Sequence, residues 1–100
     1  MIKHKYKAII TTVDDIKFSS KKEGNHYCNL KLLQKNGDIL FFLRQVPFHL
    51  PGNIKYVCDF MVFWKNGDVT IEDVKGYKTR LYTTKKKLVE SLYPIKIKEI

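Results

Sequence analysis

Apolar residues follow two different spacings along the chain, and the change between them marks its predicted elements. In residues 19–36 they recur three or more positions apart, at Tyr27, Leu30 and Leu33, as on one face of a helix. Residues 54–64 are almost continuously apolar and are bounded by turn residues, which is typical of a buried strand. The pattern therefore predicts a protein that combines helices with strands.

Caps and turn residues delimit the other elements. Ser20 and Glu23 have the spacing of a capping box, in which each residue satisfies a backbone donor at the start of a helix. Pro47 restricts its strand to a sheet edge or a strand end. Further strands are predicted at 6–13, 38–50, 69–75 and 95–100, with a turn back through 16–18 and a second helix at 79–93. On that helix we expect one side to carry Leu81, Leu88, Val89 and Leu92.

The order of these elements predicts an α/β fold. After an N-terminal extended arm or hairpin at 1–18, the chain runs helix, strand, strand, strand, helix, strand. That order is typical of a mixed sheet flanked by helices. The 100 residues fit a single domain, 1–100. No apolar run is long enough to span a membrane, and no signal segment is evident, so we expect a cytoplasmic protein without a membrane partner.

The net charge of the chain indicates the chemical class of its binding partner. Nineteen Lys and Arg residues against ten Asp and Glu give a formal net charge of +9. Such an excess on a small domain favours a polyanionic partner, usually nucleic acid, although a lysine-rich surface alone gives the same count. The second predicted helix and the residues before it supply the candidate DNA-binding side chains Lys78, Arg80, Lys85, Lys86 and Lys87. The alternative is that they form an ordinary solvated helix face.

The two cysteines, Cys28 and Cys58, are isolated in the sequence and suit free thiols in a reducing compartment. A zinc site that joins them to His26 and His49 is conceivable. No pair has a CxxC-like spacing, however, so we do not expect zinc.

Three residues of the central strands have the chemistry of a catalytic site. Asp59 interrupts the apolar 54–64 strand, where a carboxylate is costly unless it is paired or bound to metal. Asp73 and Lys75 lie two apart on the next strand and so share a face. Carboxylates on adjacent strands can hold a hard divalent cation, and a nearby lysine can activate water or stabilise phosphate charge. The alternatives are a hydrogen-bonded strand-end Asp59, a surface charge pair, and a Glu23 that only caps its helix.

The loop between these two strands decides which acids face each other. With a two-residue loop at Asn66-Gly67, Asp59 would share its face with Glu72. With a three-residue loop, in which Gly67 is left-handed, Asp59 would oppose Asp73. The second register gives a coherent apolar face and brings both site residues together, so we expect it.

Six stretches, taken in order, carry a family resemblance: 20–23, 30–33, 37–39, 45–48, 54–60 and 72–76. They resemble a family of small phage-encoded endodeoxyribonucleases, formerly described as a domain of unknown function, within the PD-(D/E)XK nuclease superfamily. That superfamily includes restriction enzymes and Holliday-junction resolvases. The resemblance covers nearly the whole chain. It departs from the pattern at Gly24-Asn25, where relatives carry better helix formers, and at Cys58, where the superfamily's name expects proline.

The resemblance implies a restriction-endonuclease-like core and Mg²⁺- or Mn²⁺-dependent hydrolysis of DNA. Glu23, Asp59 and Asp73 would be the metal ligands, Lys75 the catalytic lysine, and Gln45 a glutamine that recurs near such sites. By analogy with resolvases, branched DNA such as a Holliday junction is the expected substrate, and a homodimer of a phage or prophage protein the expected form. Two alternatives stay open: a catalytically idle DNA-binding module, and a subunit that cuts only with a partner.

Overall fold

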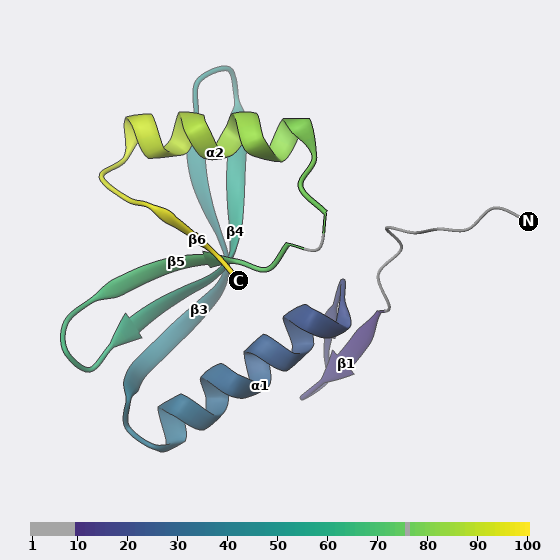
Figure 1. Cartoon of the computed structure of the whole chain (residues 1–100), viewed down its shortest axis with the longest axis vertical. Coiled ribbons are helices and arrows are strands. Elements are labelled where there is room, and N and C mark those ends of the chain that lie inside the picture. Colours follow the sequence, from purple (N-terminus) through teal and green to yellow (C-terminus); the bar gives the residue numbers. More distant parts are fainter. Residues whose placement is uncertain (1–9, 76) are drawn as a thin grey trace, which may run out of the picture.

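A computed structural model describes residues 10–75 and 77–100 and shows a mixed four-stranded sheet with two helices (Figure 1). The elements are β1 (Thr11–Val13), β2 (Ile16–Phe18), α1 (Lys21–Lys35), β3 (Ile39–Leu50), β4 (Ile54–Trp64), β5 (Val69–Asp73), α2 (Arg80–Leu92) and β6 (Ile97–Glu99). From α1 onward this is the predicted order, so the α/β architecture is confirmed. Residues 6–9 of the first predicted strand lie outside the described residues.

The sheet has the order β3-β4-β5-β6, in which only β5 and β6 run parallel. β3 and β4 form a long hairpin, and its turn contains Gly52 and Asn53 at φ values of 81° and 57°. β3 is an edge strand, as Pro47 predicts. α2 makes the crossover that a parallel pair requires. No helix among the described residues is long and apolar enough to cross a membrane.

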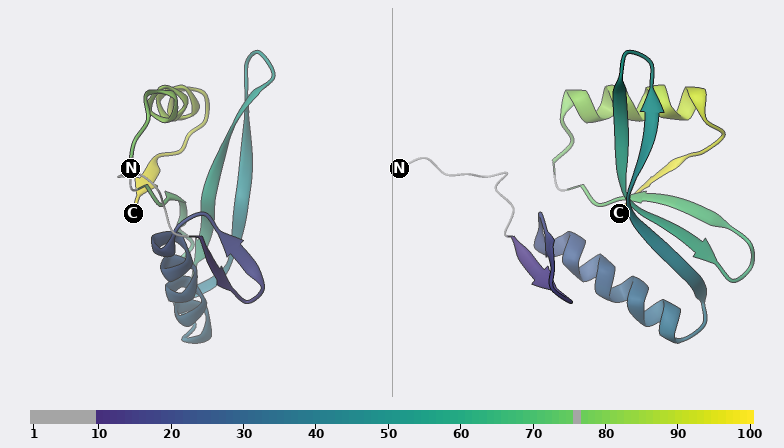
Figure 2. Two further views of the ribbon diagram at one scale, coloured as in Figure 1. Left: turned by 90° about the vertical axis from the view of Figure 1, so that its right-hand side faces the viewer. Right: turned by 180° about the vertical axis from the view of Figure 1, so that it is seen from behind.

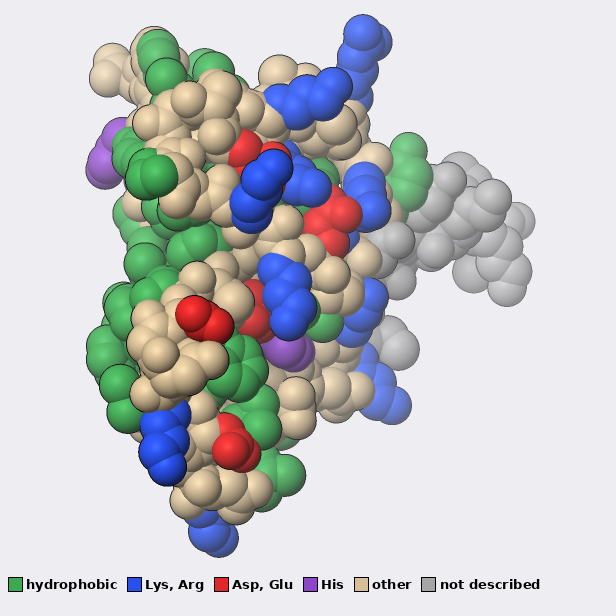
Figure 3. All heavy atoms as spheres, turned by 60° about the vertical axis from the view of Figure 1, so that its left-hand side comes forward, with side chains coloured by type: hydrophobic (Ala, Val, Ile, Leu, Met, Phe, Trp, Pro, Cys, Tyr) green, Lys and Arg blue, Asp and Glu red, His purple; other side chains and the backbone are tan. Residues whose placement is uncertain are grey.

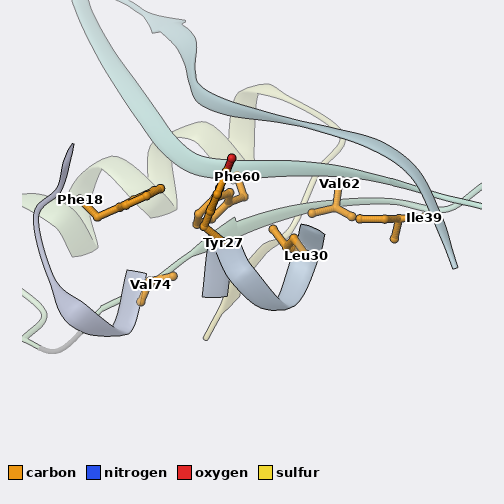
Figure 4. Packing of buried hydrophobic residues seen from close by; sticks show 7 residues of the cluster. All are labelled: Phe18, Tyr27, Leu30, Ile39, Phe60, Val62 and Val74. Carbon is orange, nitrogen blue, oxygen red and sulfur yellow. The ribbon is translucent and has the colours of Figure 1, made fainter. Parts of the chain in front are cut away.

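The first hydrophobic cluster joins α1 to the sheet. Its members are Phe18, Tyr27, Leu30, Ile39, Phe60, Val62 and Val74 (Figure 4). The β1–β2 hairpin takes part through Phe18, whose ring centroid lies 5.1 Å from that of Tyr27. Each fully buried side chain of this size contributes on the order of 1.5–3 kcal/mol to folding. This packing holds the middle of α1 against the sheet.

The second cluster lies under α2. It consists of Leu50, Tyr56, Cys58, Ile71, Tyr82, Val89 and Ile97. α2 lies across the half of the β3–β4 hairpin near its turn, whereas α1 lies along the other half (Figures 1 and 2). The site described below lies where these two halves meet.

The apolar side of α2 is buried only in part. Leu81 and Leu92 are 63 % and 52 % exposed, whereas Val89 is buried. Tyr82 takes the inward place one residue after Leu81, because it lies two turns before Val89 on the face that meets the sheet.

Candidate functional site

The loop between β4 and β5 determines which carboxylates meet. The Trp64 backbone N–H donates to the Asp68 carbonyl across 2.8 Å, and Gly67 has a φ of 97°. The connection is therefore the predicted three-residue loop with a left-handed glycine. Extended by one pair, the register of the ladder sets Asp59 opposite Asp73. The register prediction is confirmed.

Asp59 and Asp73 span the point where β4 and β5 separate. Asp73 Oδ1 accepts a hydrogen bond from the Asp59 backbone N–H at 3.1 Å. Asp59 Oδ2 accepts one from the Val74 backbone N–H at 2.8 Å. Each carboxylate thus accepts a hydrogen bond from a backbone N–H of the opposite strand, just beyond the last residue pair of the ladder. Both side chains are held in place by backbone groups, which is how a reactive site is preorganised.

One carboxylate oxygen of Asp73, Oδ2, has no hydrogen-bond partner in the part of the chain that the structure describes. The side chain is fully buried. Burial raises the pKa of Asp73 to about 6, and the negative charge of Glu23 adds to the rise, while Lys75 opposes it. A buried acceptor without a donor can instead be satisfied by a bound cation or by a proton on the carboxylate.

Glu23 reaches the same region from the first turn of α1. It is 4 % exposed, and its carboxylate accepts a hydrogen bond from the Ser19 hydroxyl at 2.9 Å. Burial, and next the charge of Asp59, raise its pKa, although Arg44 and Lys75 act the other way. Its backbone N–H also donates to the N-cap serine, so the capping position and the site position coincide in one residue.

Lys75 follows the end of β5 and lies beside the acids. Its Nζ is 4.6 Å from the ring centroid of Tyr82, a cation–π contact that links it to α2. Its charge lowers the pKa of both Asp73 and Glu23. Lys75 is therefore within electrostatic reach of two of the three predicted acids, Asp73 and Glu23.

Gln45 lies across from Asp59 on β3. Its neighbours Arg44 and Val46 pair with Phe60 and Cys58, which leaves Gln45 at the level of Asp59. Its φ of 53° is left-handed, which costs a non-glycine residue on the order of 1 kcal/mol. Its side chain is exposed, so it is open to a ligand.

The donor set fits a hard divalent ion by its chemistry, because carboxylate oxygens are the ligands that Mg²⁺ prefers. Within residues 10–75 and 77–100, however, no group of three or more His, Cys, Asp or Glu side chains is arranged so that it could hold a metal ion. The charge of Asp59 nevertheless raises the pKa of Glu23, and the charge of Glu23 raises that of Asp73, so Glu23 lies within electrostatic reach of both. For a zinc site the chemistry is poor, because burial raises the pKa of the Cys58 thiol to about 11.

A family model described as a protein of unknown function, DUF1064, matches residues 3–99. The chain belongs to the DUF1064 family. A comparison with curated proteins finds no match.

This DUF1064 chain has a second buried polar group that the sequence did not reveal. His26 Nε2 lies 2.6 Å from Glu72 Oε1, and the Thr70 hydroxyl donates to Glu72 Oε2 at 2.7 Å. The Trp64 Nε1–H donates in turn to Thr70 Oγ1 at 2.9 Å. Burial alone would raise the pKa of Glu72, but hydrogen bonds from His26 and Thr70 lower it overall. Only its position beside Asp73 could have suggested that Glu72 has a role.

That network links α1 to β5 close to the site. His26 lies one helical turn after Glu23, and Glu72 directly precedes Asp73. The two bonded residues are 46 positions apart in the sequence, so their contact holds α1 at one position along β5. We infer that this contact sets the position of Glu23 relative to Asp73.

Two of the five predicted DNA-binding residues have an acidic partner. Lys78 Nζ lies 2.8 Å from Glu99 Oε1, and Lys86 Nζ lies 3.5 Å from Glu99 Oε2. The hydrogen bond from Lys78, then that from Tyr82, lowers the pKa of Glu99 to about 2. On the face shown in Figure 3, basic side chains are spread among acidic ones and do not form one continuous patch. Charge along α2 is therefore partly neutralised by the protein itself.

Without divalent ions, Asp73→Asn is expected to stabilise the chain at neutral and alkaline pH. Because burial raises the pKa of Asp73 to about 6, the folded state keeps a proton that the unfolded state has lost. Stability therefore falls as pH rises through about 4 to 6. The asparagine avoids that loss, so the variant should be more stable by about 2 kcal/mol near pH 8.

Denaturant unfolding at about pH 4 and pH 8 in a chelator measures this difference, which should shrink toward zero at the acidic end. Asp38→Asn, at an exposed position, is the matched control. If Asp73→Asn were less stable than the wild type at pH 8, the interpretation of Asp73 as a destabilised site residue would be wrong.

Proposed function

We propose that this chain is a metal-dependent endonuclease that hydrolyses DNA phosphodiester bonds on a PD-(D/E)XK-type core. One observation carries the proposal: Asp59 and Asp73 meet where β4 and β5 separate, and one buried Asp73 oxygen has no donor among the described residues. Lys75 lies within electrostatic reach of that pair. Acids with an adjacent lysine at diverging strand ends supply what phosphodiester hydrolysis requires.

The roles follow from position. Asp59, Asp73 and Glu23 would hold Mg²⁺ or Mn²⁺, which when bound supplies Lewis-acid activation and a more acidic water. Lys75 would place its ammonium group against the phosphate oxygen on which negative charge develops, or against the attacking water. The exposed amide of Gln45, across from Asp59, would orient the same water or phosphate.

DNA is the proposed substrate because of the net charge of +9 and the family resemblance. Branched DNA is the form we propose first. Symmetric cutting of a four-way junction takes two active sites, which a homodimer would supply. The cytoplasm of a phage-infected or prophage-carrying cell is the corresponding location. These parts rest on resemblance and charge.

The test is to incubate the purified protein with Mn²⁺ or Mg²⁺ and linear, nicked, flapped and four-way DNAs, with a chelator as the control. We expect divalent-dependent cleavage of at least one form. If the protein binds DNA and cuts none of them, the proposal fails. A DNA-binding module without catalysis, or a partner-dependent subunit, would then account for the chain.

A further inference from the structure

A groove of about 290 Å³ lies between α2 and the turn-proximal half of the β3–β4 hairpin. Lys55 and Tyr56 of β4 line one wall, and Tyr82 and Lys85 of α2 line the other. Lys75 lies in its lining as well, so the groove opens next to the candidate site. The groove and the site are therefore parts of one surface.

The charge of this groove differs from that of the rest of α2. Lys55, Lys75 and Lys85 come from three separate elements, and the described lining contains no acidic side chain. Lys78 and Lys86, by contrast, are paired with a glutamate. Three ammonium groups around one groove favour a polyanion, although Lys75 is also within electrostatic reach of Asp73 and the Tyr82 hydroxyl donates to Glu99.

Tyr56, in one wall of the groove, carries a buried polar group, its hydroxyl, without a hydrogen-bond partner among the described residues. Leaving such a group unpaired costs about 1–3 kcal/mol. The Tyr56 and Tyr82 ring centroids are 6.4 Å apart, and the Tyr82 ring carries the Lys75 ammonium.

We propose that this groove binds the phosphodiester backbone of a single nucleic-acid strand and directs it toward Lys75 and Asp73. Its volume lies at the lower end of ligand pockets, which run from about 300 Å³ upward, so it has room for a short segment of one strand. The direction of the strand rests on the proposed function, whereas binding itself does not. Lys55, outside the second helix, becomes a binding residue that the sequence did not suggest.

Binding of a fluorescent single-stranded oligonucleotide tests the proposal, measured by anisotropy over a range of salt concentrations in a chelator so that no cutting occurs. Lys55→Gln and Lys85→Gln should each weaken binding about fivefold and reduce the salt slope by about 0.7, the value for one lost contact to a single strand. Lys65→Gln in the β4–β5 loop and Lys35→Gln at the end of α1, both exposed and outside the groove lining, are the controls. Each control should change the affinity less than twofold.

Equal losses in the groove and control variants would overturn the proposal in favour of diffuse surface attraction. Unchanged binding in Lys55→Gln would overturn it directly, and so would competition by polyglutamate as strong as that by the oligonucleotide. A wild type that binds through the groove but cuts no DNA would leave this proposal standing and contradict the nuclease alone. If the wild type cuts DNA and Lys55→Gln binds the oligonucleotide normally, the nuclease proposal stands and the groove proposal is contradicted.

Discussion

Asp59→Asn is expected to abolish metal-dependent DNA cleavage, with a rate at least about a hundredfold below that of the wild type. Asparagine keeps the size of the side chain and an oxygen that can accept from the Val74 backbone N–H, now 2.8 Å from Asp59 Oδ2. It removes the negative charge that would hold the ion. DNA binding should stay the same or become tighter, because one repulsion toward phosphate is lost. Cleavage rates in Mn²⁺, calorimetric ion binding and DNA anisotropy measure the three effects.

The same substitution at an exposed acid, Asp38→Asn, should leave all three measurements unchanged. Both variants need a melting curve close to that of the wild type, because loss of the fold would mimic loss of catalysis. A well-folded Asp59→Asn protein that still cuts DNA at nearly the wild-type rate would remove Asp59 from the site.

Lys75→Ala is expected to stop cleavage and yet spare divalent-ion binding. The ammonium group would act on water or phosphate and not on the ion, so its loss leaves the carboxylates in place. It also removes the positive charge that lowers the pKa of Asp73. Ion binding should therefore be measured near pH 8, where protons no longer compete for that carboxylate.

Lys65→Ala, at an exposed position outside the groove and the site, is the control for the removal of a lysine. Tyr82 loses a cation–π contact in Lys75→Ala, which contributes only about 0.5–1 kcal/mol, so the fold should persist. If Lys75→Ala lost ion binding as completely as Asp59→Asn, the division of roles between lysine and carboxylate would be wrong.

The pairing of Asp59 with Asp73 was predictable because it depends on local rules. Side chains alternate along a strand, and a left-handed Gly67 sets the loop length, so counting residues fixes the register. The approach of Glu23 was not predictable in that way. It depends on how α1 packs on β4, and only the family resemblance pointed to it.

The surroundings of the site depend on contacts between distant parts of the chain. The pairing of Lys78 with Glu99 and the entry of Lys55 into the groove follow from tertiary packing. Apolar residues form two adjacent rows along α2. The row that contains Tyr82 packs against the sheet, and Leu81 in the other row is exposed. Spacing along one helix does not show which row meets the sheet.

The exchange of hydrogen bonds between the diverging strands also makes the site visible to spectroscopy. The Asp59 amide proton points at the carboxylate of Asp73, and the Val74 amide proton points at that of Asp59. An amide resonance shifts when its acceptor gains a proton or binds a cation, because the field along the N–H bond changes. Each acid is thus reported by a backbone nucleus on the other strand, so that two peaks in a nitrogen–proton spectrum record the state of both carboxylates separately.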